Sequence, residues 1–341
     1  MVLSFIVFAV FSCAPEEKTP KAGAADTEDM LEMLPAEAQG VFFVNVKDVM
    51  AIEAMDETLK KDENYKKYQE FIQETGIDPE KDVFYVAAAL LPGDEETKQK
   101  GVGIINLKYD PDVLMDLIKE KSAEEGTSIQ ETDYSGQTIY NMKPEESEEE
   151  VEIEEEEEEE FTETEGAFTF LDSSNIAVGN ESSIKSVIDV IKNNKDNIYK
   201  NQQVTKLLEK TDRDTMFWGA VNIPSEAVEE AAAQNPMLQN LSSVHAVTMN
   251  FDYKKQNISA MIKLMSTDPE KNSQIANALN GFKSMGQMAA QENPAIGELM
   301  NKITIESDEE MVKISADIPE ELIDKLKKES PGEEKETEEK K

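Results

Sequence analysis

The sequence predicts an α+β protein of two similar units, each with a mostly antiparallel sheet and helices packed on one face. Two observations carry this prediction. Apolar residues alternate along the chain between a spacing of two, typical of strands, and a spacing of three to four, typical of helices. The order strand, helix, two strands, helix and strand pair in the first half then recurs in the second.

The first unit is expected over residues 30–200. Asp110 and Pro111 open one of its helices, because proline fits the first helical position and an acid there favours the helix dipole. Residues 168–191, two short strands and a helix, are expected to have no full counterpart in the second half and to complete the sheet. The other strands are expected at 41–46, 82–91, 101–109, 128–132 and 137–142, with helices near 49–59 and 64–74.

The second unit is expected over residues 201–328. Asp268 and Pro269 should open a long helix, as Asp110 and Pro111 do in the first unit. Ile318 and Pro319 lead into a last amphipathic helix. The expected strands are 215–223, 244–253, 257–265, 303–306 and 311–316.

The N-terminal residues predict that the protein is exported from the cytoplasm. Leu3–Phe11 is apolar but too short to span a hydrocarbon core of about 30 Å, which takes about 20 helical residues, so residues 1–12 are expected to be a signal peptide. Val10–Cys13 resembles the lipobox of bacterial lipoproteins. That resemblance implies that Cys13 carries acyl chains such as palmitate and becomes the new N-terminus, followed by a flexible tether over 13–29.

The charge of the chain excludes a nucleic-acid partner. The sequence has 34 Lys and Arg against 73 Asp and Glu, a net charge of −39, whereas nucleic-acid binding needs a basic face. Much of the excess lies in residues 145–165, expected to be a disordered acidic insertion because like charges repel and little apolar surface offsets the ordering entropy. Residues 329–341 are expected to be a disordered charged tail.

The Glu run in this insertion is the one weak candidate for a metal site. Carboxylate oxygens suit Ca²⁺ or Mg²⁺, but the spacing fits no defined loop such as an EF-hand. A solvated loop and a docking segment for a basic partner are the alternatives. The candidate ligands are Glu154, Glu155, Glu156, Glu157, Glu158, Glu159 and Glu160.

The sequence offers no catalytic residue and no cofactor site. His245 is the sole histidine and lies within an expected strand, which favours a structural role. Gly101 and Gly103 lack the third glycine and the following helix of a dinucleotide fingerprint. A hydrolase that uses carboxylates in a cleft between the two units is the alternative from another class.

Methionines are concentrated near the C-terminal helices. Met285, Met288 and Met300 could form an adaptable apolar groove for a peptide or a lipid, or could simply fill the core. Gly281 and Gly286 weaken the helix that carries the first two, which would suit a mobile lid.

Short turn motifs resemble those of a family of uncharacterised secreted bacterial lipoproteins with an α+β fold. The motifs are Leu34-Pro35-Ala36 before the first strand, Gly76-Ile77-Asp78-Pro79 after a helix, and Asp172–Gly179. The resemblance spans Leu34–Ile191 and implies no activity. The expected function is therefore a non-catalytic binding or structural protein of the cell envelope, lipid-anchored to a bacterial membrane and facing the periplasm or the exterior. An envelope protein, a peptide or a lipid would be its ligand.

Overall fold

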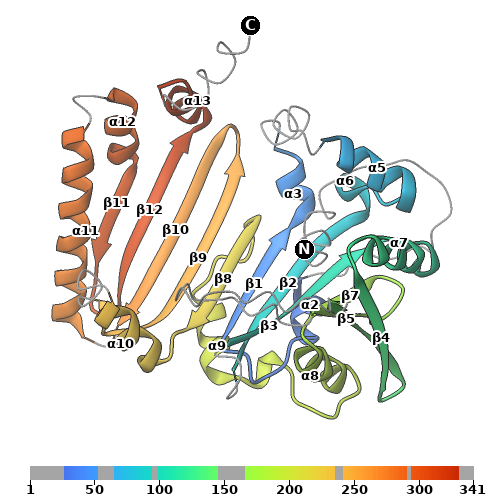
Figure 1. Cartoon of the computed structure of the whole chain (residues 1–341). Coiled ribbons are helices and arrows are strands. Elements are labelled where there is room, and N and C mark those ends of the chain that lie inside the picture. The colour runs from blue at the N-terminus through green and yellow to red at the C-terminus, as the bar shows by residue number, and fades with distance from the viewer. Residues whose placement is uncertain are drawn as a thin grey trace, which may run out of the picture. The chain divides into compact units, whose positions relative to one another are not determined.

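The computed structural model describes residues 27–52, 65–93, 99–144, 166–234, 241–266, 268–289 and 293–329. The chain divides into two units, Met1–Thr205 and Lys206–Lys341, and the division falls inside helix α9 (Gln202–Leu208). Each unit combines an antiparallel sheet with helices, as predicted (Figure 1).

The sheet of the first unit has seven strands within the described residues. Their order is β1-β2-β3-β7-β6-β5-β4, and each neighbouring pair is antiparallel. The strands are β1 (Gly40–Asn45), β2 (Val83–Pro92), β3 (Gln99–Leu107), β4 (Thr127–Tyr134), β5 (Gln137–Pro144), β6 (Gly166–Phe170) and β7 (Asn175–Gly179).

Helices cover both faces of this sheet, so the prediction of helices on one face is wrong for the first unit. Met115 and Ile118 of α7 pack against Phe168 of β6. Ala167 and Thr169 alternate with Phe168 and are also fully buried, and α8 contacts β6 and β7. A strand that is buried at successive positions needs cover on both sides. The helices are α2 (Thr27–Glu32), α3 (Val46–Met50), α5 (Tyr65–Thr75), α6 (Pro79–Asp82), α7 (Pro111–Glu124), α8 (Glu181–Ile191) and the 3₁₀ turn η1 (Ile198–Lys200).

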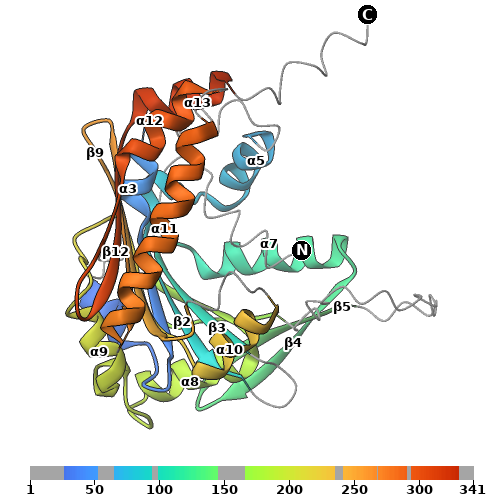
Figure 2. The ribbon, with the colours of Figure 1, turned by 90° about the vertical axis from the view of Figure 1, so that its left-hand side faces the viewer.

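The second unit has a five-stranded antiparallel sheet within its described residues, in the order β8-β9-β10-β12-β11. Figure 2 shows α11, α12 and α13 on one face of these strands. Ile275 and Ala276 of α11 pack there against Val244 and Val312. The elements are β8 (Phe217–Asn222), α10 (Ser225–Gln234), β9 (Val244–Lys254), β10 (Asn257–Ser266), α11 (Pro269–Ala289), α12 (Pro294–Lys302), β11 (Ile303–Ser307), β12 (Met311–Pro319) and α13 (Glu320–Glu329).

The two sheets share one strand order. The series β1-β2-β3-β7-β6 of the first unit corresponds to β8-β9-β10-β12-β11 of the second. The expectation that residues 168–191 have no full counterpart is therefore wrong, because β6, β7 and α8 hold the places of β11, β12 and α13. The addition in the first unit is the hairpin β4–β5, which extends the sheet beyond β6.

Matching caps begin the equivalent helices α7 and α11. A carboxylate oxygen of Asp110 accepts hydrogen bonds from the backbone N–H groups two and three residues further on, at 3.0 and 3.3 Å. Asp268 does the same at 3.0 and 3.2 Å. Each pair satisfies two of the free donors at a helix start, which confirms the reading of the two Asp-Pro sequences.

Several predictions lie at or beyond the edges of the described residues. α2 begins at Thr27 and buries Met30 and Leu31, so its first turn takes up the last residues of the expected tether. Glu329 ends α13, whereas the expected tail begins at that residue. The expected signal peptide over 1–12, the acidic insertion over 145–165 and the remainder of the tail lie outside the described residues.

Candidate functional site

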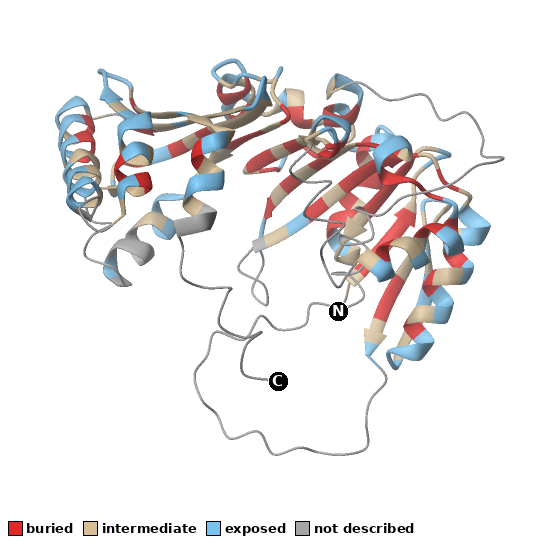
Figure 3. Ribbon diagram, turned by 90° about the horizontal axis from the view of Figure 1, so that it is seen from above, coloured by how far each residue is buried: buried red, intermediate tan, exposed pale blue. Residues whose placement is uncertain are grey.

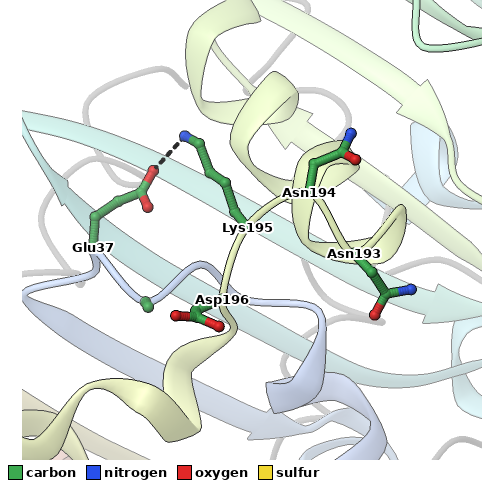
Figure 4. Close-up of a pocket in the computed structure, with 6 residues that line it drawn as sticks. Glu37, Asn193, Asn194, Lys195 and Asp196 are labelled. Carbon is green, nitrogen blue, oxygen red and sulfur yellow. Dashed lines mark hydrogen bonds and ion pairs between the residues drawn. The ribbon is translucent and has the colours of Figure 1, made fainter.

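A shallow polar pocket lies in the first unit where the segment before β1 meets the loop after α8. Its volume is about 480 Å³. Asn193, in this loop, adopts a left-handed backbone conformation with φ of 59°, which asparagine tolerates well. Figure 4 shows the lining side chains, which are those of Ala36, Glu37, Asn193, Asn194, Lys195 and Asp196.

Three side chains form a polar triangle at this pocket. Glu37 Oε1 accepts hydrogen bonds from Ser186 Oγ at 2.8 Å and from Lys195 Nζ at 3.1 Å. Lys195 Nζ also lies 3.3 Å from Ser186 Oγ. A serine beside a lysine can act as an activated nucleophile when the lysine is a free amine. Here Lys195 is the ion-pair partner of Glu37, and an ammonium group has no lone pair with which to accept the proton of Ser186.

Backbone contacts at the same place indicate a structural role for the triangle. The N–H of Ala36 donates to the carbonyl of Asp196 at 3.1 Å, and the N–H of Ile198 donates to the carbonyl of Leu34 at 2.8 Å. The amide of Asn201 donates to the carbonyls of Ala36 and Ala38. The triangle and these bonds fasten the Leu-Pro-Ala segment to the loop after α8.

A second candidate is an apolar surface on α11 of the second unit. Phe282 is 46% exposed, Met285 66% and Met288 71%. These residues are three apart, so each is a neighbour of the next on the helix surface. Phe282 lies two turns after buried Ile275 and borders the buried side of the helix, whereas Met285 and Met288 lie further from that side. In Figure 3, where α11 is the helix at the far left, exposed residues line its outer side. We call Ala278, Gly281, Phe282, Met285 and Met288 the α11 stripe.

The α11 stripe carries no charge in a highly charged protein. Asn272–Ala289 holds one charged residue, Lys283, whereas 31% of the whole chain is charged. Lys283 Nζ donates to the backbone carbonyl of Ile303 at the start of β11. Its ammonium group is therefore directed toward the sheet, and the outward side of the helix keeps only apolar and neutral polar groups.

The predicted methionine cluster is divided by the structure. Gly286 of α11 faces Met300 of α12, and a Cβ at Gly286 would lie 2.8 Å from the Met300 sulfur. Gly286 therefore permits close packing of the two helices, and Met300 is a packing residue. Met285 and Met288 point outward instead. The sequence signals for this division are the low charge of the segment and the three-residue spacing of its large apolar residues.

The other predicted site residues are not brought together. Cys13 and Glu154–Glu160 lie outside the described residues, and His245 is exposed near the start of β9. Within the described ranges there is no group of three or more His, Cys, Asp or Glu side chains suited to hold a metal ion. The carboxylate hydrolase, placed between the two units, stays a prediction. Among the described helices, none combines the length and apolar character needed to cross a bilayer.

One family profile matches most of the chain. It is described as a protein of unknown function, DUF3352, and matches residues 63–295. The chain belongs to this family. No curated protein matches the sequence.

Solved structures of TP0453 are similar to this chain at low identity. Crystal form I is 10% identical with a TM-score of 0.45, over 90% of this chain and 98% of that one. Crystal form III is 11% identical with a TM-score of 0.46, over 88% and 97%.

The polar triangle is testable by removing the serine hydroxyl. Replacing Ser186 with Ala should destabilise the first unit by about 1 kcal/mol and speed amide exchange at Ala36 and Ile198, because buried Ser186 bridges the two segments. Hydrogen exchange measured by mass spectrometry, with Ser182→Ala on the exposed start of α8 as the control, checks this. Unchanged exchange at both amides would show that the triangle does not hold the Leu-Pro-Ala segment to the loop after α8.

Proposed function

We propose that this member of the DUF3352 family is a non-catalytic binding protein of the bacterial cell envelope, held at a membrane by lipid on Cys13 and facing the periplasm or the exterior. The observation that carries the binding role is the exposed, uncharged α11 stripe. The support for the anchor is the sequence pattern around Cys13.

The α11 stripe has the properties of a contact surface. Single exposed apolar residues are common on soluble proteins, whereas adjacent large ones mark interaction surfaces. Burial of a Met or Phe side chain contributes about 1.5–3 kcal/mol, so a partner that covers Phe282, Met285 and Met288 recovers a stabilisation that the isolated chain forgoes. Methionine adapts its shape to a partner because its side chain is unbranched and flexible.

Lipid on Cys13 would complement this surface. Each buried methylene contributes about 0.8 kcal/mol of membrane affinity, and firm attachment takes two or more chains. A lipid-anchored protein is confined to a thin layer above the membrane, where its effective concentration toward other envelope components is high. A modest apolar surface is sufficient for association under those conditions.

The anchor is tested by substituting its only candidate residue. Cys13→Ser should move the protein from the membrane fraction to the soluble fraction of cells, because serine cannot form the thioether to lipid. Immunoblotting of the fractions is the measurement, with Ser12→Ala as the control that keeps the thiol. If the Cys13→Ser protein still sediments with membranes, the lipid anchor is wrong.

The binding role is tested in membranes extracted with a mild detergent. The wild-type chain should migrate on a native gel as a complex larger than a single copy of the chain. Met285→Glu should reduce that complex to the monomer, because it places a charge within the contact surface. Ser273→Glu, at an exposed position of α11 outside the stripe, is the matched control and should leave the complex intact. A complex that survives Met285→Glu would remove α11 from the binding role.

A further inference from the structure

We infer that the partner of the α11 stripe is a second copy of this chain, with the two α11 helices packed antiparallel about a two-fold axis near Lys283. The inference rests on the binding role proposed above and names its partner. It draws on the spacing of the stripe, on its alternation of small and large residues, and on the charge of the chain.

The spacing of the stripe is that of a helix–helix seam. Ala278, Gly281, Met285 and Met288 follow one another at intervals of three, four and three residues. Apolar residues that recur at alternating intervals of three and four keep one side of a helix, here called the seam, facing a partner helix. Met285 and Met288 are the large members of the seam and are more than half exposed, so the seam is not used within the unit.

The stripe is complementary to itself only when two copies run in opposite directions. An axis at position 283 places Met285 of one copy opposite Gly281 of the other, and Met288 opposite Ala278. Each large side chain then meets a small residue across the seam. A parallel pair would instead place methionine on methionine and glycine on glycine, which leaves gaps at one end. A two-fold interface requires this kind of self-complementarity.

Gly281 supports the same arrangement. Glycine within a helix is destabilising relative to alanine. Packing within the unit explains the glycine at position 286, because Met300 fills the space of its missing Cβ. It does not explain the glycine at position 281, where an added Cβ would have no described heavy atom within 4 Å. In the antiparallel pair, the Met285 side chain of a second copy fills the space beside Gly281, as Met300 does beside Gly286.

The distribution of charge argues against a basic peptide as the partner and indicates where two copies can meet. A surface that attracts a basic peptide carries acids, and Asn272–Ala289 carries none. Two copies with a net charge of −39 each repel one another, so they can approach most closely where acids are absent. The direction of Lys283 toward Ile303 leaves the seam neutral on both copies.

The size of the stripe predicts a weak dimer. A helix of 21 residues is about 31 Å long, and a single helix pair buries less than the 800 Å² or so per partner of a standard interface. Purified chain is therefore expected to be monomeric when dilute and dimeric when concentrated. Confinement at a membrane would favour the dimer further.

The test is sedimentation equilibrium of the purified full-length chain between about 1 µM and 1 mM. The wild type and Ser273→Glu should form dimers with the same dissociation constant, and Met285→Glu should raise that constant about tenfold or more. Thermal unfolding of each variant confirms that it folds. A wild-type chain that stays monomeric across this range, or a Met285→Glu variant that dimerises as well as Ser273→Glu, overturns the inference.

A charge pair tests the antiparallel register. Gly281→Lys should weaken self-association on its own, because it places lysine opposite Met285. An equimolar mixture of Gly281→Lys with Met285→Glu should form a heterodimer, because the new lysine and glutamate then face each other. In a parallel pair these positions do not meet. Failure of the mixture to associate, when the wild type does, overturns the register.

The remaining outcomes separate this inference from the proposed function. If the purified chain is monomeric but its complex in detergent extracts still depends on Met285, the binding role stands and the second copy is wrong. If monomeric chain floats with phosphatidylcholine vesicles and Met285→Glu abolishes flotation, the stripe binds a lipid surface and the dimer is wrong. If neither the extract complex nor the purified chain responds to Met285→Glu, the proposed function fails as well.

Discussion

Electrostatic repulsion between acidic surfaces is the constraint that decides which part of this protein can contact another copy. With a net charge of −39, the surfaces of the chain repel other acidic molecules, including copies of itself. The segment Asn272–Ala289 departs from this rule, because it has no acid and its one lysine donates to the carbonyl of Ile303. The same segment exposes Phe282, Met285 and Met288. Absence of charge and exposure of apolar area therefore coincide on one helix, which is the condition for a contact that long-range repulsion does not oppose.

The repeated fold explains how such a helix arises. α7 and α11 hold the same place, after the third strand of each sheet, and both begin with an Asp-Pro cap. α7 has 14 residues and packs Met115 and Ile118 against its sheet, whereas α11 has 21 residues. The first half of α11 supplies Ile275 and Ala276 to the core, and the stripe lies toward its second half. The additional length therefore provides surface beyond that needed to cover the sheet.

Local sequence patterns predicted most strands and helices, because strand alternation, caps and turn glycines act within a few residues. Asp110 and Asp268 are examples in which the sequence identified the start of a helix and the side chain that caps it. The pairing of strands was harder to predict, since β6 and β7 match β11 and β12 only through their order in the sheet. The cover on both faces of β6 depends on α8, which is distant from α7 in sequence. The methionines could be found from sequence, but their division into packed Met300 and exposed Met285 depends on how α12 meets Gly286. For Cys13 and Glu154–Glu160, the sequence remains the sole guide.

The salt dependence of self-association is the most direct test of the central role of charge. If two acid-free stripes bring together two chains that otherwise repel, a rise in salt from about 0.1 M to about 1 M, which shortens the Debye length from about 10 Å to about 3 Å, should strengthen the dimer. Sedimentation equilibrium at both salt concentrations measures the change in the dissociation constant. A dissociation constant that falls with salt agrees with this account. One that rises with salt would mean that attraction between opposite charges holds the copies together, and would contradict it.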